Sequence, residues 1–224
     1  SGKHYFMKNQ PRLSLFFLLL SFIFYFSDAK AQGETFTKRT IASGFNSAWE
    51  VVYGPNDSLW VTENVSYKVQ RVSIANGVKT ELLDLSSNTS TFTTGTRPQG
   101  GLMGLAIHPN LYSSDPAVRA AKPWVYLAFV YNKATPNSTC ANPGSASGCI
   151  FSTRIVRYDY IGNSLINPTI ILDNMPGSSD HNSGRLLIGP TIEPGLTGET
   201  ASHTQFRLYY TIGDMGAGQF TNTN

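Results

Sequence analysis

Three short segments place polar side chains beside glycine-rich turns. They are Arg97–Pro109 (RPQGGLMGLAIHP), Ser178–Pro190 (SSDHNSGRLLIGP) and Tyr209–Gln219 (YYTIGDMGAGQ). Glycine allows tight turns, and functional side chains are often carried on loops at the ends of rigid elements. We therefore begin the search for chemistry in these three segments.

The second segment holds an imidazole beside a carboxylate, His181 and Asp180, at a turn that leads into an apolar run. The pKa of histidine lies near neutrality, so His181 is suited to remove a proton from an alcohol. A nearby carboxylate can orient the ring and stabilise the imidazolium. An ordinary polar turn is the alternative.

His108, followed by Pro109, is expected to be structural, and Arg185 is expected to pair with a nearby acidic residue rather than bind an anion.

Other classes of protein are not indicated. The sequence contains no dinucleotide-binding glycine motif after a strand, no P-loop, no nucleophile elbow and no paired zinc motif. Only 14% of the residues are charged, and no basic stripe of the kind that binds nucleic acid is visible. Asn64, Asn88 and Asn137 lie in glycosylation sequons, which matter only in a cell that glycosylates secreted chains.

The N-terminal region predicts export. Basic residues at 7–12 precede fourteen uncharged residues at 13–26 (LSLFFLLLSFIFYF), and small residues follow. This order is typical of a signal peptide, which we assign to 7–31 with cleavage after Ala31; an uncleaved anchor is the alternative. Residues 1–6 are expected to be a cloning scar or upstream translation. Cleavage at residue 31 would leave 13 of the 17 basic and 13 of the 14 acidic residues, a neutral chain.

Two cysteines, Cys140 and Cys149, are separated by eight small or turn-forming residues. Exported proteins mature where disulfides persist, and a bridge here would close a short loop. A metal site would need further cysteine or histidine ligands at suitable spacing, and none is near. We therefore predict a disulfide between Cys140 and Cys149.

The rest of the chain predicts an all-β fold of antiparallel meanders. Short alternating or apolar runs are separated by turns such as Gly54–Asp57 and Ala75–Gly77. Three stretches share a rhythm of apolar, aromatic, apolar and small residues: 59–62, 125–128 and 208–211. The segments between these stretches differ in length, which a fold of sheets repeated around a central axis permits because the longer segments can form loops on one face. A β-sandwich is the alternative fold. The expected strands are 48–53, 58–63, 68–74, 78–85, 124–131, 153–160, 169–172, 185–188 and 207–213, the last opening a third repeat.

Taken together, the three segments resemble the soluble PQQ-dependent glucose dehydrogenase family, also called glucose/sorbosone dehydrogenases. The resemblance lies in the order QGGLMGLAIHP, SSDHNSGRLLIGP and RLYYTIGDMGAGQ, with DSLWVTE and KVQRVSI upstream. It covers residues 44–219 and implies a six-bladed β-propeller, of which 32–224 would form about the first half of the ring. A chain truncated within this ring is the expectation.

The resemblance also implies a chemistry. The C1 hydroxyl of an aldose would be oxidised to the lactone, with hydride transfer to pyrroloquinoline quinone (PQQ) beside Ca²⁺. His181 would be the general base and Asp214 would support it, while Gln99, Asp180 and Gln219 would contact the sugar. The ligands of PQQ and calcium would lie beyond residue 224, so no metal ligand is assigned within this chain and the 224 residues alone are expected to be inactive.

The partners implied are an aldose and an external electron acceptor. The protein is expected in the periplasm or the medium, without a stable membrane anchor after cleavage. No nucleic-acid partner is expected, and the full-length protein is compatible with a homodimer. Two alternatives remain open. One is a non-catalytic secreted propeller that binds ligands, since one fold hosts many functions. The other is a calcium-dependent propeller hydrolase or lactonase.

Overall fold

The computed structural model describes residues 36–87, 99–132, 151–178, 181–191 and 205–215. Ser1–Arg39 and Thr40–Asn224 are separate units. In the first unit only residues 36–39 are described, and they have no regular secondary structure. The strands and helices below all belong to the second unit.

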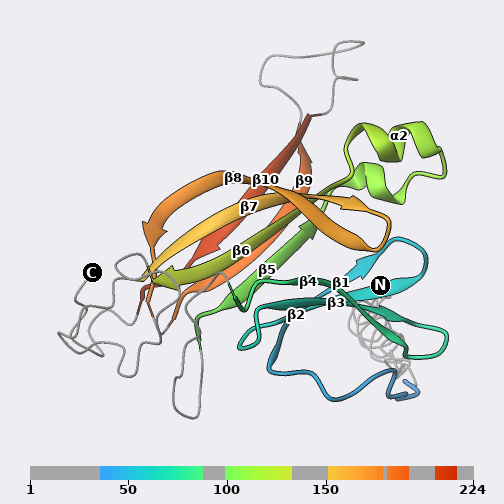
Figure 1. Ribbon diagram of the computed structural model, residues 1–224, viewed down its shortest axis with the longest axis horizontal. Helices are drawn as coiled ribbons and strands as arrows, with labels where there is room; N and C mark the ends of the chain where they lie inside the picture. The colour runs from blue at the N-terminus through green and yellow to red at the C-terminus, as the bar shows by residue number, and fades with distance from the viewer. Residues whose placement is uncertain (1–35, 88–98, 133–150, 179–180, 192–204, 216–224) are drawn as a thin grey trace, which may run out of the picture. The chain divides into compact units, whose positions relative to one another are not determined.

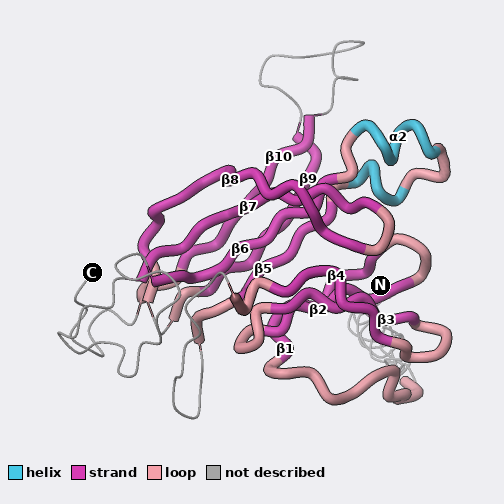
Figure 2. The backbone as a smooth tube through the Cα atoms, viewed as in Figure 1, coloured by secondary structure: helices cyan, strands magenta, loops and turns pink. Residues whose placement is uncertain are grey.

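The second unit contains three antiparallel sheets whose strands follow chain order (Figures 1 and 2). The first sheet consists of β1 (Ala48–Gly54), β2 (Ser58–Glu63), β3 (Lys68–Ser73) and β4 (Lys79–Asp84). The second consists of β5 (Leu102–Ile107), β6 (Trp124–Asn132), β7 (Phe151–Ile161) and β8 (Ser164–Pro176). The third pairs β9 (Ser183–Thr191) with β10 (Gln205–Ile212).

Between β5 and β6 the chain forms two short helices that were not predicted from the sequence. They are the 3₁₀ helix η1 (Pro109–Tyr112) and the α-helix α2 (Pro116–Ala121). Each has proline in its first turn and a side chain that caps its N-terminus, from His108 and Asp115 respectively.

The predicted all-β meander fold is confirmed. Four-stranded antiparallel meanders repeated along the chain are the blades of β-propellers, and the described residues contain two such blades and the first hairpin of a third. One detail of the prediction was wrong, because β9 and not 207–213 opens the third sheet. The shared aromatic rhythm around Trp60, Tyr126 and Tyr209 lies in β2, β6 and β10 and so marks the second strand of each sheet.

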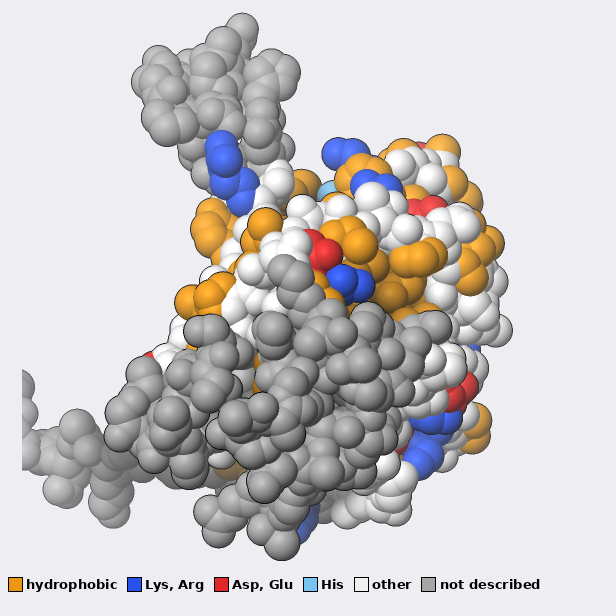
Figure 3. Space-filling model, turned by 60° about the vertical axis from the view of Figure 1, so that its left-hand side comes forward, with side chains coloured by type: hydrophobic (Ala, Val, Ile, Leu, Met, Phe, Trp, Pro, Cys, Tyr) orange, Lys and Arg blue, Asp and Glu red, His pale blue; other side chains and the backbone are white. Residues whose placement is uncertain are grey.

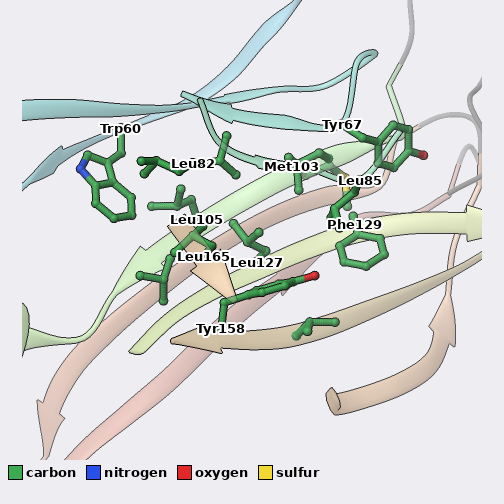
Figure 4. Packing of buried hydrophobic residues seen from close by; sticks show 14 of the residues in the cluster. Trp60, Tyr67, Leu82, Leu85, Met103, Leu105, Leu127, Phe129, Tyr158 and Leu165 are labelled. Carbon is green, nitrogen blue, oxygen red and sulfur yellow. The ribbon is translucent and has the colours of Figure 1, made fainter. Parts of the chain in front are cut away.

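The first and second sheets share one hydrophobic core (Figure 4). Trp60 of β2 and Tyr67 of the β2–β3 turn are fully buried, and Leu105 and Phe129 of the second sheet pack in the same cluster. The Tyr67 hydroxyl donates a hydrogen bond of 2.8 Å to the Val130 carbonyl oxygen. This bond satisfies a buried polar group and fixes the turn against the second sheet.

A smaller cluster joins the second and third sheets. Leu186 of β9 is buried with Ala106, Ala128 and Ile155. Because β5 is covered on one side by the first sheet and on the other by β9, all six of its residues are buried. A strand buried on both faces shows no alternation of apolar and polar residues, which explains why only the end of β5, before His108, was expected from the sequence.

The close contact between β5 and β9 requires glycine at position 104. A Cβ added to Gly104 would lie 2.1 Å from the Gly184 carbonyl oxygen and 2.9 Å from the Leu186 amide nitrogen. We expect Gly104→Ala to lower the free energy of unfolding by about 1–3 kcal/mol, because backbone atoms must move apart. Urea denaturation measures this change.

The matched control is Gly189→Ala on β9, whose added Cβ would meet only the Tyr209 ring, at 3.3 Å. A side chain can move where backbone cannot, so this variant is expected to remain within about 0.5 kcal/mol of the parent. Equal losses in both variants would contradict the close-contact explanation.

Large hydrophobic side chains remain exposed on the outer strands, and Figure 3 shows hydrophobic side chains grouped on one face of the described surface. Exposed apolar surface of this kind is typical of a sheet that packs against another element. The exposed residues on β8, β9 and β10 are Ile166, Ile170, Ile171, Leu172, Leu187, Phe206, Tyr209 and Ile212.

Candidate active site

The candidate site forms where the ends of strands from all three sheets meet. Asn64 follows β2, Gln99 precedes β5, His181 precedes β9 and Asp214 follows β10. Since β9 and β10 are antiparallel, with Ser183 opposite Ile212, the start of one strand lies beside the end of the other. This pairing brings together two predicted residues that are 33 positions apart in the sequence.

His181 and Asp214 contact each other directly. His181 Nδ1 lies 2.9 Å from Asp214 Oδ1, and the side chains are 33% and 60% exposed. In the neutral ring this geometry assigns the proton to Nδ1, which donates to the carboxylate, and leaves Nε2 as the basic nitrogen. The pair therefore has the arrangement of a base whose orientation is fixed by a carboxylate, in a position that small molecules can reach.

The backbone at His181 is unusual. Its φ angle is +48°, in the left-handed region that side chains other than glycine rarely adopt. The His181 carbonyl oxygen accepts a hydrogen bond of 3.4 Å from the Met215 amide, and a Cβ added to Gly213 would lie 1.8 Å from that oxygen. Glycine at position 213 is therefore what allows the two loops to approach. Strain of this kind concentrates at functional sites.

Gln99 is bound to the backbone of the same histidine. Its Oε1 accepts a hydrogen bond of 3.2 Å from the His181 amide, which fixes the orientation of the carboxamide. Among the described residues no acceptor is found for Gln99 Nε2. This group can donate to a hydroxyl oxygen of a ligand beside the His181 ring.

Two fully buried asparagines bind the segment around Gln99. Asn64 Nδ2 donates to the Gly100 carbonyl oxygen, and Asn64 O accepts from the Leu102 amide at 3.1 Å. Asn182 Nδ2 donates to the Gln99 carbonyl oxygen at 2.9 Å. The position of Gln99 is thus determined by the first and third sheets together.

Asn182 also closes its own loop. Its Oδ1 accepts from the Ser178 amide at 2.8 Å, and its Nδ2 donates to the Ser178 carbonyl oxygen at 2.7 Å. Its backbone carbonyl accepts from the Gly213 amide at 3.1 Å. Asn182 was not predicted from the sequence, and the only available signal was its place directly after His181.

Several other sequence predictions can be compared with the structure. His108 lies beyond the opposite end of β5, is 4% exposed and caps η1, in agreement with a structural histidine. Arg185 does pair with an acidic residue, but the partner is Glu50, 135 positions away and 2.8 Å distant, rather than a local one. The side chain of Asn64 is fully buried, so its sequon is not an accessible glycosylation site in the folded protein.

Other predicted features lie outside the described residues. They are Asp180, Gln219, His203, the Cys140–Cys149 disulfide, residues 1–6 and the signal peptide at 7–31. In the described part of the chain no cluster of three or more His, Cys, Asp or Glu side chains could hold a metal ion. The same part contains no helix long and apolar enough to span a membrane.

The fold and the site define a chain of propeller blades with a solvent-accessible His–Asp pair at the strand ends. No family model matches the chain. Over 197 residues it is 30% identical to quinoprotein glucose dehydrogenase B of Acinetobacter calcoaceticus, an alignment that covers 85% of this chain and 33% of the relative. The resemblance to the soluble PQQ-dependent glucose dehydrogenases, predicted from three motifs, is confirmed, and the chain spans about a third of the relative's length.

Two solved structures are also similar. The PQQ-bound aldose sugar dehydrogenase of Streptomyces coelicolor is 26% identical, with 75% of this chain and 44% of that one covered and a TM-score of 0.47. An oxidoreductase of Thermus thermophilus, described as a glucose dehydrogenase, is 19% identical, with coverages of 66% and 36% and a TM-score of 0.45.

Proposed function

We propose that the full-length protein is an exported, PQQ- and calcium-dependent sugar dehydrogenase that oxidises the C1 hydroxyl of an aldose to the lactone. The observation that carries the proposal is the 2.9 Å contact between His181 and Asp214, with Gln99 bound to the backbone of the same histidine. One relative of the chain is a quinoprotein glucose dehydrogenase. The proposal concerns the whole protein, and the 224 residues alone are expected to be inactive.

The described residues fit the substrate side of such a reaction. His181 Nε2 takes the C1 hydroxyl proton, and the Asp214 carboxylate stabilises the imidazolium that forms. Gln99 Nε2 donates to a sugar hydroxyl and orients the ring, while Asp180 and Gln219 are proposed as further sugar contacts. When bound, PQQ supplies the acceptor for the hydride that leaves C1.

The ligands of PQQ and Ca²⁺ are proposed to lie beyond residue 224. The side chains described at the site are an imidazole, a carboxylate and a carboxamide, which suit hydroxyl groups and a proton. A quinone that carries carboxylates needs cationic partners, and calcium needs several oxygen ligands. The described residues therefore account for the base and the substrate contacts only.

The test is dye reduction by the full-length protein. We expect activity with an aldose, an artificial electron acceptor, PQQ and Ca²⁺, and loss of activity when PQQ or Ca²⁺ is omitted. The methyl glycoside of the same sugar is the matched control, because its C1 oxygen has no proton for His181 to remove. Lactone hydrolysis without PQQ would instead identify a hydrolase, and sugar binding without oxidation would identify a binding propeller.

A further inference from the structure

A second pocket lies at the opposite end of the same strands from His181. It has a volume of about 400 Å³ and lies between the second and third sheets. Its lining includes His108, directly after β5, and Trp124, the first residue of β6, together with Phe206 at the start of β10. The proposed active site lies before β5 and after β10, so the two sites are separated by the length of these strands.

The described lining of this pocket is basic and aromatic. Lys122 and Arg207 contribute positive charge, and none of the described lining residues is acidic. Lys122 Nζ lies 5.5 Å from the centre of the Trp124 ring, and the Arg157 guanidinium carbon lies 4.5 Å from the same ring. The Trp124 side chain is thus surrounded by cationic groups, which favours a negatively charged ligand.

The nearest carboxylate by strand pairing, that of Asp159, does not line the pocket. Asp159 of β7 lies opposite Trp124 in the β6–β7 register, but it accepts a hydrogen bond of 3.1 Å from Asn167 Nδ2 and does not line the pocket. In addition, Arg157 Nε is buried without an acceptor among the described residues. Asp159 keeps its charge when it accepts from a neutral amide, so the Trp124 ring has two cations beside it, Lys122 and Arg157, against one carboxylate on the paired strand.

His108 provides a polar donor in the wall of this pocket. The side chain is 4% exposed, and its ring contacts the Trp124 and Phe206 rings edge-on, with centroids 5.5 and 5.7 Å away. Nδ1 accepts a hydrogen bond of 3.2 Å from the Asn110 amide, so the proton of the neutral ring is on Nε2. Burial, assisted by the charge of Lys122, lowers the pKa of the imidazole and favours this neutral form.

The donor has no acceptor within the described part of the protein, since the Asn110 amide is the hydrogen-bond partner found for the His108 ring there. The His108 side chain is almost completely buried, but its Nε2 atom is not one of the fully buried polar atoms without a partner, so it remains accessible to water or a ligand in the pocket. The ring contacts hold the imidazole in place, so Nε2 is preorganised to donate to a ligand atom. An acceptor on an anion would satisfy both this donor and Lys122.

We propose that this pocket binds a small aromatic carboxylate, with the carboxylate between Lys122 and His108 Nε2 and the flat ring against Trp124 and Phe206. The volume lies in the range of small-molecule sites, which combine apolar walls with a few well-placed polar groups. Charge-assisted hydrogen bonds supply the orientation, and the aromatic walls supply the contact area. This inference does not depend on the proposed dehydrogenase activity.

The test is calorimetric titration of the full-length protein with benzoate, without sugar or PQQ. Benzamide, which has the same shape and no charge, is the matched ligand, and we expect it to bind about tenfold more weakly or worse. Lys122→Met is expected to weaken benzoate binding by about tenfold and to leave benzamide binding unchanged.

Lys79→Met on β4 is the control for loss of one positive charge, since that side chain binds the Ser43 and Gly44 carbonyl oxygens on the first sheet. It is expected to leave the affinity for benzoate unchanged. Equal affinities for benzoate and benzamide, no effect of Lys122→Met, or no heat of binding at millimolar benzoate would each overturn the proposal. Melting temperatures of both variants establish that folding is retained.

Discussion

Replacement of His181 by asparagine in the full-length protein is expected to lower kcat for sugar oxidation by about 100- to 10,000-fold, the usual contribution of a positioned general base. Asparagine is chosen because the φ angle of residue 181 is +48° and asparagine tolerates this region better than alanine. The variant removes the basic nitrogen with little added backbone strain. Steady-state kinetics with PQQ and Ca²⁺ measures the loss, and thermal unfolding shows whether the fold is retained.

A second variant, His181→Gly, separates loss of the base from loss of the fold. Glycine adopts positive φ freely and leaves space where the ring was. Because the side chain of His181 is 33% exposed, imidazole added from solution can reach this space. We expect added imidazole to restore part of kcat to His181→Gly. An unchanged kcat in His181→Asn would exclude His181 as the general base.

The same variants distinguish the dehydrogenase from the alternative of a binding propeller. A protein that only captures a sugar does not need a base, so its affinity would change little when the ring nitrogen is lost. In the dehydrogenase, sugar binding through Gln99 is expected to be retained while oxidation is lost. The binding measurement is therefore expected to give the same result for both functions, and the kinetic assay separates them, because only the dehydrogenase has an oxidation rate that is lost with the base.

Most strands could be predicted from the sequence because turn signals bound them, and β3 also because its two faces differ, with Val69 and Val72 buried between more exposed residues. β2, β3 and β6 have bounds within a residue or two of those expected, and the turn before β4 contains the predicted asparagine–glycine pair. Only the end of β5 was predicted, because a strand covered on both faces shows no alternation that would mark its extent. The position of β6 and β10 as second strands of their sheets also could not be seen, since an aromatic rhythm repeats without indicating which strand of a repeat carries it.

The site was predictable where its residue types are chemically distinctive. The resemblance implied His181 as the base, Asp214 as its support and Gln99 as a sugar contact, and the structure brings these three residues together. It could not identify the residues that hold them in place. A buried asparagine such as Asn182 looks in sequence like any turn residue, because its importance depends on carbonyl groups up to 83 positions away.

The Glu50–Arg185 ion pair illustrates the same limit. The Glu50 side chain is 9% exposed and is bound by an arginine that is 70% exposed and belongs to a different sheet. Local sequence suggests a partner for Arg185 within its own loop. The actual pairing depends on β1 and β9 lying near each other through β5, which is a property of the sheet packing and not of either strand.

Asn182→Ala is expected to lower kcat by about 100-fold and the free energy of unfolding by about 2–4 kcal/mol. The asparagine side chain makes three hydrogen bonds, two with Ser178 and one with the Gln99 carbonyl oxygen, and it is fully buried. Without them the loop that holds His181 is no longer fixed against Gln99. A shift of the base by about 1 Å is enough to cause a loss of this size.

Thermal stability alone would not separate a positioning role from a purely structural one, so a matched variant is needed. Thr62→Ala removes another fully buried polar side chain, whose Oγ1 donates to the Met103 carbonyl oxygen at 2.7 Å and accepts from the Glu50 amide at 3.1 Å. It is expected to lower stability by about 1–3 kcal/mol while kcat remains near that of the parent, because neither bond of the Thr62 side chain involves the His181 loop. If Asn182→Ala and Thr62→Ala reduced kcat equally at temperatures where both are folded, Asn182 would be a structural residue, since the loss would follow stability and not the position of the base.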